Sequence, residues 1–475
     1  MSDKILSSRI FLFTLIIELI TNFGNASLVL LLFTVVISLV LVNVKQNFKY
    51  LLILFLISDD QSRFLSDSLG HPIFSIYTLP NFSMIVTIFL LLVGVLKVIK
   101  NKNIFAFSEM KILFKFYAII ILFGLVFGIL NIFKYPRMVI QDMSYQINSI
   151  AFLLVVFGVY YGNNKDLKKL LQSIVTAITV KYLILLTLFF NGDGEIVGQM
   201  VKVTGESGKS LVPLYSSIFL LLFIFVKNFT RYFYLLMFLV SLLITLSIAS
   251  RSTMVFAILI LISLIFIINI SKSRKYLYFG YFFLGVSMTV VVIETIRPGA
   301  MVNVLWKLNS FGEININATS HSSLSPVIRY IELLNIFYAH IENYTIFFGS
   351  GFGSYFVDSY VKFPFNLFGI HAYKHEWIIN RTFFKPHTTP IFLFLKIGLV
   401  GVLYYYGVFT KLFFLLKQKV KEIEVSLEYI FALAILPNIF LIITKNYSSK
   451  MQIALGIYIA IVFLITNSKK NEGKL

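Results

Sequence analysis

The chain has 475 residues, of which 58% are hydrophobic and only 13% charged, and its mean hydropathy is +0.88. Soluble domains carry about a quarter charged residues, so this composition excludes an ordinary soluble protein and indicates one embedded in lipid. The absence of cysteine excludes disulfides, thiolate nucleophiles and cysteine-based zinc sites. The net charge of +20 does not indicate nucleic-acid binding, because the basic residues form short clusters between apolar runs, as membrane orientation signals do.

Apolar runs follow one another along the chain. They lack the alternation of strands, and lipid satisfies no backbone hydrogen-bonding group, so we expect them to cross the membrane as helices. The first run lacks a small-residue cleavage site and is interpreted as a retained helix. The third is the weakest, because it runs into Asp59 and Asp60; it is alternatively a re-entrant segment. The fourteen predicted spans are 8–21, 26–43, 48–63, 82–99, 112–133, 148–162, 172–190, 211–227, 232–249, 253–271, 276–295, 390–412, 427–444 and 451–466.

The charges between these runs predict an orientation. With a cytoplasmic N-terminus, the inner connections hold most of the basic residues, including Lys165 and Lys168. The short outer connections are poor in basic residues and contain acids such as Asp193 and Glu195. This asymmetry follows the positive-inside rule. It predicts that both termini are cytoplasmic and that the long polar segment 295–389 lies outside the cell membrane.

The expected fold class is therefore an all-α polytopic membrane protein with about fourteen transmembrane helices and one large extracytoplasmic loop subdomain. Residues 1–294 would form about eleven transmembrane helices, 295–389 the loop subdomain and 390–475 about three further helices. The loop contains five of the six histidines and both tryptophans. Because titratable side chains are concentrated there, we interpret it as the functional part of the protein.

An amphipathic helix is predicted inside the loop. Ser325 is a suitable N-cap residue, and Pro326 would occupy the first helical position. At the helical spacing, one stripe is apolar: Val327, Ile331, Leu334, Tyr338 and Ile341. The opposite stripe carries most of the polar groups: Arg329, Glu332, Ile336, His340 and Asn343. We expect a helix that lies on or beside the membrane; the simplest alternative is a polar face that is only solvated.

Three other patterns resemble binding motifs without meeting their requirements. Residues 348–353 are glycine-rich, but no strand–turn–helix unit surrounds them, so a tight turn is expected. Residues 205–210 contain a Gly-Lys-Ser sequence, but a phosphate-binding loop needs a glycine five residues before the Gly-Lys pair, and that position is Val203. His371 and His375 have a spacing that suits two metal ligands, but no third ligand is evident. We therefore expect neither a nucleotide nor a metal cofactor.

Two further residues are candidates for chemistry. His387 immediately precedes an apolar span, at the predicted outer surface, and can exchange a proton near neutral pH; the alternative is an interfacial histidine without chemistry. Arg251 lies in a short hairpin at the outer membrane edge. Arginine near hydrocarbon costs about 3 kcal/mol and tends to mark function, although snorkelling also explains it. Lys181 is expected to snorkel, and Glu18 and Lys396 have no role assigned from sequence.

The order of these motifs resembles the O-antigen ligase and polymerase superfamily of bacterial envelope glycosyltransferases. An arginine in a Ser-Arg-Ser hairpin is followed by a long outer loop with an Arg-bearing helix, and that helix by the Phe-Gly-Ser-Gly-Phe-Gly turn at 348–353. Next comes His387, with Thr389 two residues on and Gly398 eleven residues on. The resemblance covers residues 248–401. It departs from the family at Thr389, where serine is common, and at Lys396, where an acidic residue is frequent.

The resemblance implies a GT-C-like fold and an enzyme that needs neither metal nor nucleotide. Such enzymes transfer a glycan from undecaprenyl diphosphate to an acceptor sugar hydroxyl on the outer face of the bacterial inner membrane. By resemblance, Arg251 and Arg329 would bind the diphosphate and His387 would act on the acceptor. Thr389, His340 and Trp377 are further candidates for contacts with the acceptor glycan.

Several functions remain open at this point. The favoured one is a surface polysaccharide polymerase; the alternatives are an O-antigen ligase that caps lipid A core and a glycosyltransferase acting on protein. A flippase of lipid-linked sugars belongs to another class, but transporters usually show internal repeats, and none is visible here. The expected partners are the undecaprenyl diphosphate-linked oligosaccharide, the acceptor glycan and membrane lipid, with a chain-length regulator protein as a further candidate.

Overall fold

The computed structural model of the chain describes residues 6–23, 26–57, 89–96, 107–191, 206–248, 251–268, 270–296, 321–363, 373, 375–445 and 447–472. This part of the chain is mostly helical, and its one strand-like contact is an isolated antiparallel bridge between Phe356 and Phe383. Five of the described helices are long and apolar enough to cross a membrane. The protein is therefore an α-helical membrane protein, as its composition predicts.

The helices fall into three groups along the chain. Those that precede the long polar segment are α1 (Ser8–Phe23), α2 (Ala26–Val42), α3 (Val44–Ile57), α6 (Ser108–Phe127), α7 (Ile129–Lys134), α8 (Pro136–Tyr160), α9 (Asn164–Asn191), α11 (Glu206–Phe225), α12 (Thr230–Ile248), α13 (Arg251–Ile267) and α14 (Lys272–Ile296). The polar segment contains α16 (His321–Glu342) and α18 (His375–Ile379). The C-terminal helices are α19 (Thr389–Lys421), α20 (Leu427–Thr444) and α21 (Ser449–Glu472).

The predicted spans coincide with helices wherever the structure describes them, although several boundaries differ. The five helices that meet the length and hydropathy requirements for a span are α6, α8, α14, α19 and α20. Shorter apolar stretches occur in α11, α12, α13 and α21. Residues 58–63 of the third predicted span lie outside the described part. That all fourteen runs cross the membrane stays a prediction.

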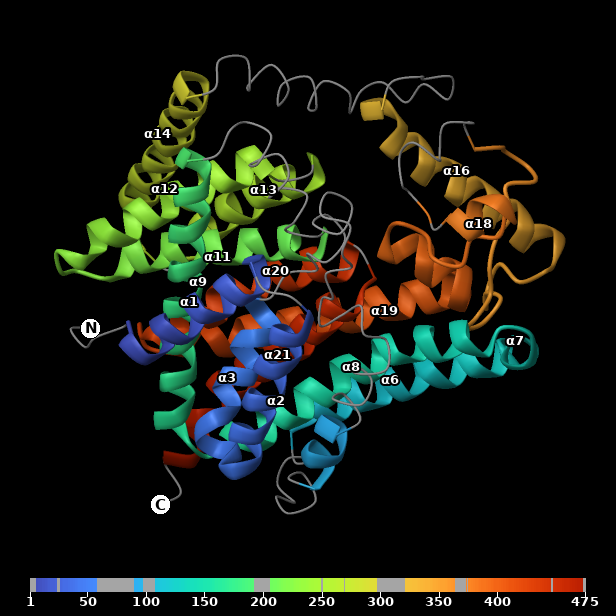
Figure 1. Ribbon diagram of the computed structural model, residues 1–475, viewed down its shortest axis with the longest axis horizontal. Coiled ribbons are helices and arrows are strands. Elements are labelled where there is room, and N and C mark those ends of the chain that lie inside the picture. Colours follow the sequence, from blue (N-terminus) through green and yellow to red (C-terminus); the bar gives the residue numbers. More distant parts are fainter. Residues whose placement is uncertain are drawn as a thin grey trace.

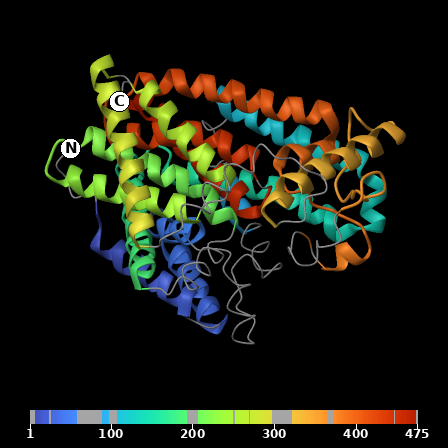
Figure 2. The same cartoon turned by 90° about the horizontal axis from the view of Figure 1, so that it is seen from above.

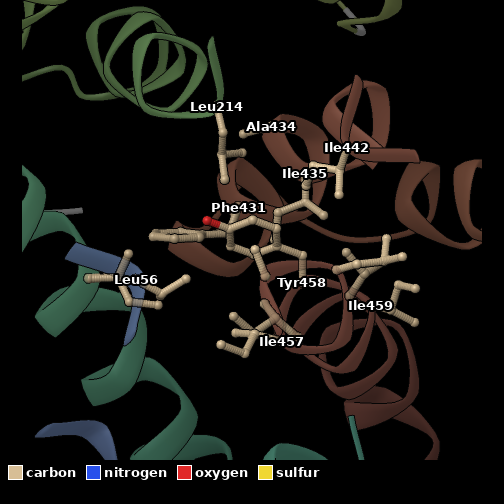
Figure 3. Packing of buried hydrophobic residues seen from close by; sticks show 14 of the residues in the cluster. Leu56, Leu214, Phe431, Ala434, Ile435, Ile442, Ile457, Tyr458 and Ile459 are labelled. Carbon is tan, nitrogen blue, oxygen red and sulfur yellow. The ribbon is translucent and has the colours of Figure 1, made fainter. Parts of the chain in front are cut away.

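The core is formed by helices that pack side by side along their apolar faces. α8 packs along α21, and α11 contacts α12, α13 and α20. Figure 3 shows one region of this core, where Leu56 of α3, Leu214 of α11, Phe431 of α20 and Tyr458 of α21 lie close together. Large side chains with staggered rotamers interdigitate closely in such an interior, and this packing fixes the frame on which the polar segment rests.

The polar segment lies at one end of the molecule. α16 and α18 are located there together with α7 and the first turns of α19, whereas α12 and α14 lie at the opposite end (Figures 1 and 2). This end has its own hydrophobic cluster, formed by α16, the segment after it and α19. Its buried members are Val327, Ile328, Ile331, Ile336, Phe356, Phe363, Tyr373, Trp377, Phe383, Phe384 and Leu395. The polar segment is thus packed against the bundle through apolar side chains and not only tethered to it.

A break in α19 joins this segment to the bundle. Gly398 has a φ of 64° and a ψ of −169°, a conformation that is essentially restricted to glycine. The break exposes backbone groups of α19, and the glycine-rich turn after α16 satisfies them. Four hydrogen bonds join the two: Leu399 N to Ile346 O (2.9 Å), Val400 N to Phe347 O (3.0 Å), Ser350 N to Leu395 O (3.0 Å) and Gly351 N to Lys396 O (2.8 Å).

The glycine-rich turn also contacts the junction of α6 and α7. The backbone N–H of Phe352 donates to the carbonyl oxygen of Gly124 (2.7 Å), and the side-chain amide of Asn131 donates to the carbonyl oxygens of Ser350 and Phe352 (3.1 Å each). The segment is therefore a turn, as its composition predicts, and not a phosphate-binding loop. Its backbone groups bind the protein itself and connect α6, α7 and α19.

Candidate active site

Three polar residues of α16 face the protein interior. Glu332, Asn335 and His340 are buried, whereas Tyr338 and Ile341 of the predicted apolar stripe are exposed. The interpretation of this stripe as a solvated polar face is therefore wrong. Its buried polar groups have hydrogen-bond partners in the chain after α16 and in α19, as a buried polar group requires; these partners include Val361, Tyr373, His387 and Phe394. The helix also begins at His321, one turn before the predicted start at Ser325.

The central contact of this interior joins Glu332 to His387. Nδ1 of His387 lies 2.6 Å from Oε1 of Glu332, and the backbone N–H of His387 lies 3.2 Å from both carboxylate oxygens. The Glu332 side chain is fully buried, whereas that of His387 is 22% exposed. The carboxylate is thus enclosed behind the imidazole, and the imidazole reaches the surface.

Tyr373 completes the surroundings of this carboxylate. Its hydroxyl donates a hydrogen bond to Oε1 of Glu332, and its ring packs edge-on against the His387 ring with centroids 4.8 Å apart. Burial, together with the Glu332 charge, raises the pKa of Tyr373 far above its ordinary value, so the hydroxyl stays protonated and acts as a donor.

This arrangement determines which nitrogen of His387 carries the proton. A carboxylate accepts hydrogen bonds, so Nδ1 is the protonated nitrogen and the lone pair of the neutral ring lies on Nε2. The negative charge of Glu332 also stabilises the imidazolium that forms when Nε2 takes up a proton. A histidine held in one tautomer by a buried carboxylate is the usual structure of a general base.

Backbone contacts fix His387 at the beginning of α19. The bridge between Phe356 and Phe383 holds the strand-like segment before it, with N–O distances of 3.1 and 2.9 Å. After it, the backbone N–H and the side-chain hydroxyl of Thr389 both donate to the carbonyl oxygen of Lys445, at the end of α20. The position of His387 is therefore set by three elements that are far apart in the sequence.

The two arginines predicted to bind a diphosphate are described to different extents. Arg329 lies on α16 one turn before Glu332, and its Nε atom is buried without a hydrogen-bond partner among the described residues. An unsatisfied buried donor is costly, which suits a group that binds a ligand. Arg251 begins α13, but its side chain lies outside the described part of the structure, so a meeting of Arg251 with His387 stays a prediction.

The three residues predicted to contact the acceptor all have contacts within the protein. Both ring nitrogens of His340 are hydrogen-bonded inside the protein, Nδ1 to Thr345 Oγ1 (2.7 Å) and Nε2 to the Phe394 carbonyl oxygen (3.0 Å). Thr389 is buried with its hydroxyl on Lys445 O, and Trp377 is buried with its indole packed on Phe384. These contacts give His340, Thr389 and Trp377 positions inside this end of the molecule; that they also contact the acceptor glycan stays a prediction.

The structure supplies partners for the intramembrane charges that sequence left without a role. Nζ of Lys396 lies 2.7 Å from Oδ2 of Asp142 and donates to the carbonyl oxygen of Ser354 at 2.6 Å. The same Asp142 oxygen accepts the backbone N–H of Gly353 at 2.8 Å. Glu18 lies 3.9 Å from Nζ of Lys181, so Lys181 pairs with an acid rather than only snorkelling. The Lys396 pair thus anchors the glycine-rich turn to α8.

The described residues add no candidate metal site to the pattern at His371 and His375. No group of three histidine or acidic side chains suitable for a metal ion occurs in the described ranges. His371 and the side chain of His375 lie outside those ranges, so the weak pattern there stays untested. Sequence reasoning missed Glu332 and Tyr373 as members of the His387 site. The only signal for Glu332 was its place on the stripe headed by Arg329.

Comparison with known proteins adds nothing to these observations, since no family model, no curated protein and no solved structure matches the chain. The function proposed below therefore depends on the residues of this site and on the membrane-protein fold that presents them.

Proposed function

We propose that the protein is a membrane glycosyltransferase that moves a glycan from a polyprenyl diphosphate carrier to a sugar hydroxyl. The observation that carries this proposal is the contact between the partly exposed imidazole of His387 and the buried carboxylate of Glu332. The pair lies where a chain segment enters α19, one of the helices able to span a membrane. A proton acceptor in that position can reach a hydroxyl group beside a substrate that is anchored in lipid.

In the proposed reaction, the acceptor hydroxyl oxygen attacks the anomeric carbon of the donor glycan. A bond forms between that oxygen and the anomeric carbon, the bond from the anomeric carbon to the diphosphate oxygen breaks, and the hydroxyl proton passes to Nε2 of His387. The electron pair of the broken bond leaves with the polyprenyl diphosphate. Attack opposite the leaving group inverts the anomeric centre, and general-base assistance contributes about 10²–10⁴ in rate.

The leaving diphosphate needs its developing charge neutralised. Arg329 and Arg251 are the proposed groups, because a guanidinium donates two parallel hydrogen bonds to phosphate oxygens. Fixed donors of this kind act most strongly where water is excluded. The unsatisfied buried Nε of Arg329 supports this role, and Arg251 enters through its motif position alone.

The acceptor distinguishes the possible members of this enzyme class. We favour a polymerase that joins repeat units on the carrier at the outer face of the bacterial inner membrane, with both termini cytoplasmic. A ligase that transfers the finished glycan to lipid A core is the second candidate. A flippase would not require the carboxylate-supported histidine, and this observation favours the enzyme.

A strain lacking the gene tests the proposal through the glycan it makes. Single-repeat capped core would identify a lost polymerase, and uncapped core with accumulated lipid-linked polymer a lost ligase. His387→Ala should fail to restore the polymer at normal protein abundance, and Arg251→Lys should restore little, because lysine lacks the planar pair of donors. Polymer of wild-type length in the His387→Ala strain would refute the base assignment.

A further inference from the structure

The outward face of α16 is mainly apolar from Tyr330 to the end of the helix. Its exposed side chains share one side of the helix at the spacing of three or four residues. They are Tyr330, Leu333, Phe337, Tyr338, Ile341 and, just after the helix, Tyr344. Monomeric soluble surfaces rarely present such a continuous apolar patch to water. In its described part, α16 thus buries Glu332, Asn335 and His340 together with several apolar residues, and it presents mainly apolar side chains on the outside.

α7 continues the same kind of surface. Of its six residues, Leu130 is 80% exposed and Phe133 84% exposed. Ile129 and Ile132 are exposed as well. In the fold, α7 connects the end of α6 to the start of α8 at the same end of the molecule as α16 (Figure 1).

Aromatic contacts connect this surface to a helix that can span the membrane. Phe348, in the turn after α16, stacks on Phe127 at the end of α6 with centroids 5.2 Å apart and planes within 7°. Both rings are partly exposed, and the outward side chains of α6 before them, Leu122 and Val126, are also exposed and apolar. The apolar face of α16 is therefore continuous with the surface that α6 presents to lipid.

We propose that the outward face of α16 and the helix α7 form a lipid-embedded rim that dips into the outer part of the bilayer. α16 is not among the described helices apolar enough to span a membrane, and a helix with one apolar face lies in the interface rather than across it. Lys134 and Arg137, both exposed, follow directly after the apolar residues of α7, where basic groups contact lipid headgroups. The occupant of this surface is thus bilayer lipid.

The inference is independent of the proposed function, but one consequence rests on it. With its outward face in lipid, α16 presents Arg329 and Glu332 from its other side at the depth of the headgroups. The diphosphate of a polyprenyl carrier lies at that depth, so the embedded rim would bring the carrier and the site to the same level.

The absence of cysteine makes the test direct, because each single-cysteine variant carries one label. Ile341→Cys and Leu130→Cys report on the rim. Asn343→Cys is the matched control, since it is exposed two residues from Ile341 but off the apolar face. Each variant is labelled with an environment-sensitive fluorophore and reconstituted in vesicles. Quenching is then measured with a nitroxide near the glycerol end of the lipid acyl chain and with iodide in the water on both sides.

We expect the labels at Ile341 and Leu130 to be quenched several-fold more strongly by the lipid nitroxide than the label at Asn343, with the reverse order for iodide. Equal iodide quenching at all three positions would place the face in water. Quenching of the rim labels by neither reagent would place it under protein, such as a second copy of the chain. Either result overturns the proposal, and neither depends on enzymatic activity.

Discussion

Nδ1 of His387 lies 2.6 Å from Oε1 of Glu332, a fully buried carboxylate 55 positions earlier in the chain. The contact joins the start of α19 to the inner face of α16. The glycine-rich turn and the Phe356–Phe383 bridge lie between these two residues in the sequence and hold the described part of the connecting segment in place. Interactions that hold this segment in place should therefore affect both stability and activity.

The hydroxyl of Tyr373 should matter more than that of a matched surface tyrosine. Tyr373→Phe removes a hydrogen bond to the buried Glu332 carboxylate, and we expect a loss of about 1.5–3 kcal/mol in the free energy of unfolding. Tyr360 donates to Glu342 on the same helix, but at the surface, so Tyr360→Phe should change stability by less than about 0.5 kcal/mol. Unfolding in detergent compares the two. Equal losses in the free energy of unfolding would mean that the hydrogen bond to Glu332 contributes no more to stability than a surface hydrogen bond.

The buried Lys396–Asp142 pair should be sensitive to loss of one partner. Lys396→Met leaves Asp142 buried without its counter-charge, and we expect a loss of about 3–5 kcal/mol. Lys396→Met combined with Asp142→Asn should recover part of this, because no lone charge remains. Lys169→Met breaks a largely exposed pair with Asp166 and should cost less than about 1 kcal/mol. Melting temperatures of the wild type and of these three variants test the comparison. A double variant less stable than Lys396→Met alone would contradict it.

Two glycines of α19 should respond in opposite ways to alanine. At Gly398 a Cβ would lie 2.4 Å from the backbone nitrogen of Gly349, and the backbone there is non-helical. We expect Gly398→Ala to cost more than about 3 kcal/mol. At Gly407 a Cβ meets nothing within 4 Å, so Gly407→Ala should stabilise the helix by about 0.5–1 kcal/mol. Thermal unfolding of both variants measures the two effects. A Gly398→Ala variant as stable as the wild type would contradict the close packing of the α19 break against the glycine-rich turn.

His340 gives the fold a dependence on pH. Burial lowers the pKa of His340 below its ordinary value of 6.5, although its bond to the Phe394 carbonyl partly opposes this. The unfolded chain then takes up the proton more readily than the folded one, so stability is full above about 6.5 and falls as the pH drops below it. Melting temperatures at successively lower pH should fall more steeply for the wild type than for His340→Gln. Parallel curves would exclude this role.

Hydropathy predicted helices well where they contact lipid or apolar core. The run at 427–444 has the boundaries of α20. For α8 only 148–162 was predicted, although the helix begins at Pro136. The missing turns contain Asp142 and Gln146, which are buried and pair with Lys396 and Tyr447 from distant segments. A sliding hydropathy pattern detects apolar surroundings, and it cannot detect a polar residue that is paired inside the protein.

The same limit explains which residues of the candidate site could be predicted from the sequence. His387 and Arg329 could be identified because their residue types and positions are unusual in a chain so apolar. Glu332 could not be linked to His387, since nothing local in either segment indicates a contact across 55 residues. The interpretation of the polar stripe of α16 as a solvated face failed for a related reason. Periodicity separates an apolar stripe from a polar one, but it cannot tell whether lipid, water or protein covers each.

The most direct test of the account compares two glutamates of α16 in the purified protein. Glu332→Gln and Glu342→Gln are reconstituted in vesicles with the lipid-linked oligosaccharide extracted from a strain lacking the gene, and the release of polyprenyl diphosphate is followed together with glycan growth. We expect Glu332→Gln to lower the rate by about 10²-fold or more at unchanged protein abundance, because the charge that orients His387 and stabilises its imidazolium is lost. Glu342→Gln should retain the wild-type rate. Wild-type turnover by Glu332→Gln would contradict the claim that this carboxylate and His387 act together as the base.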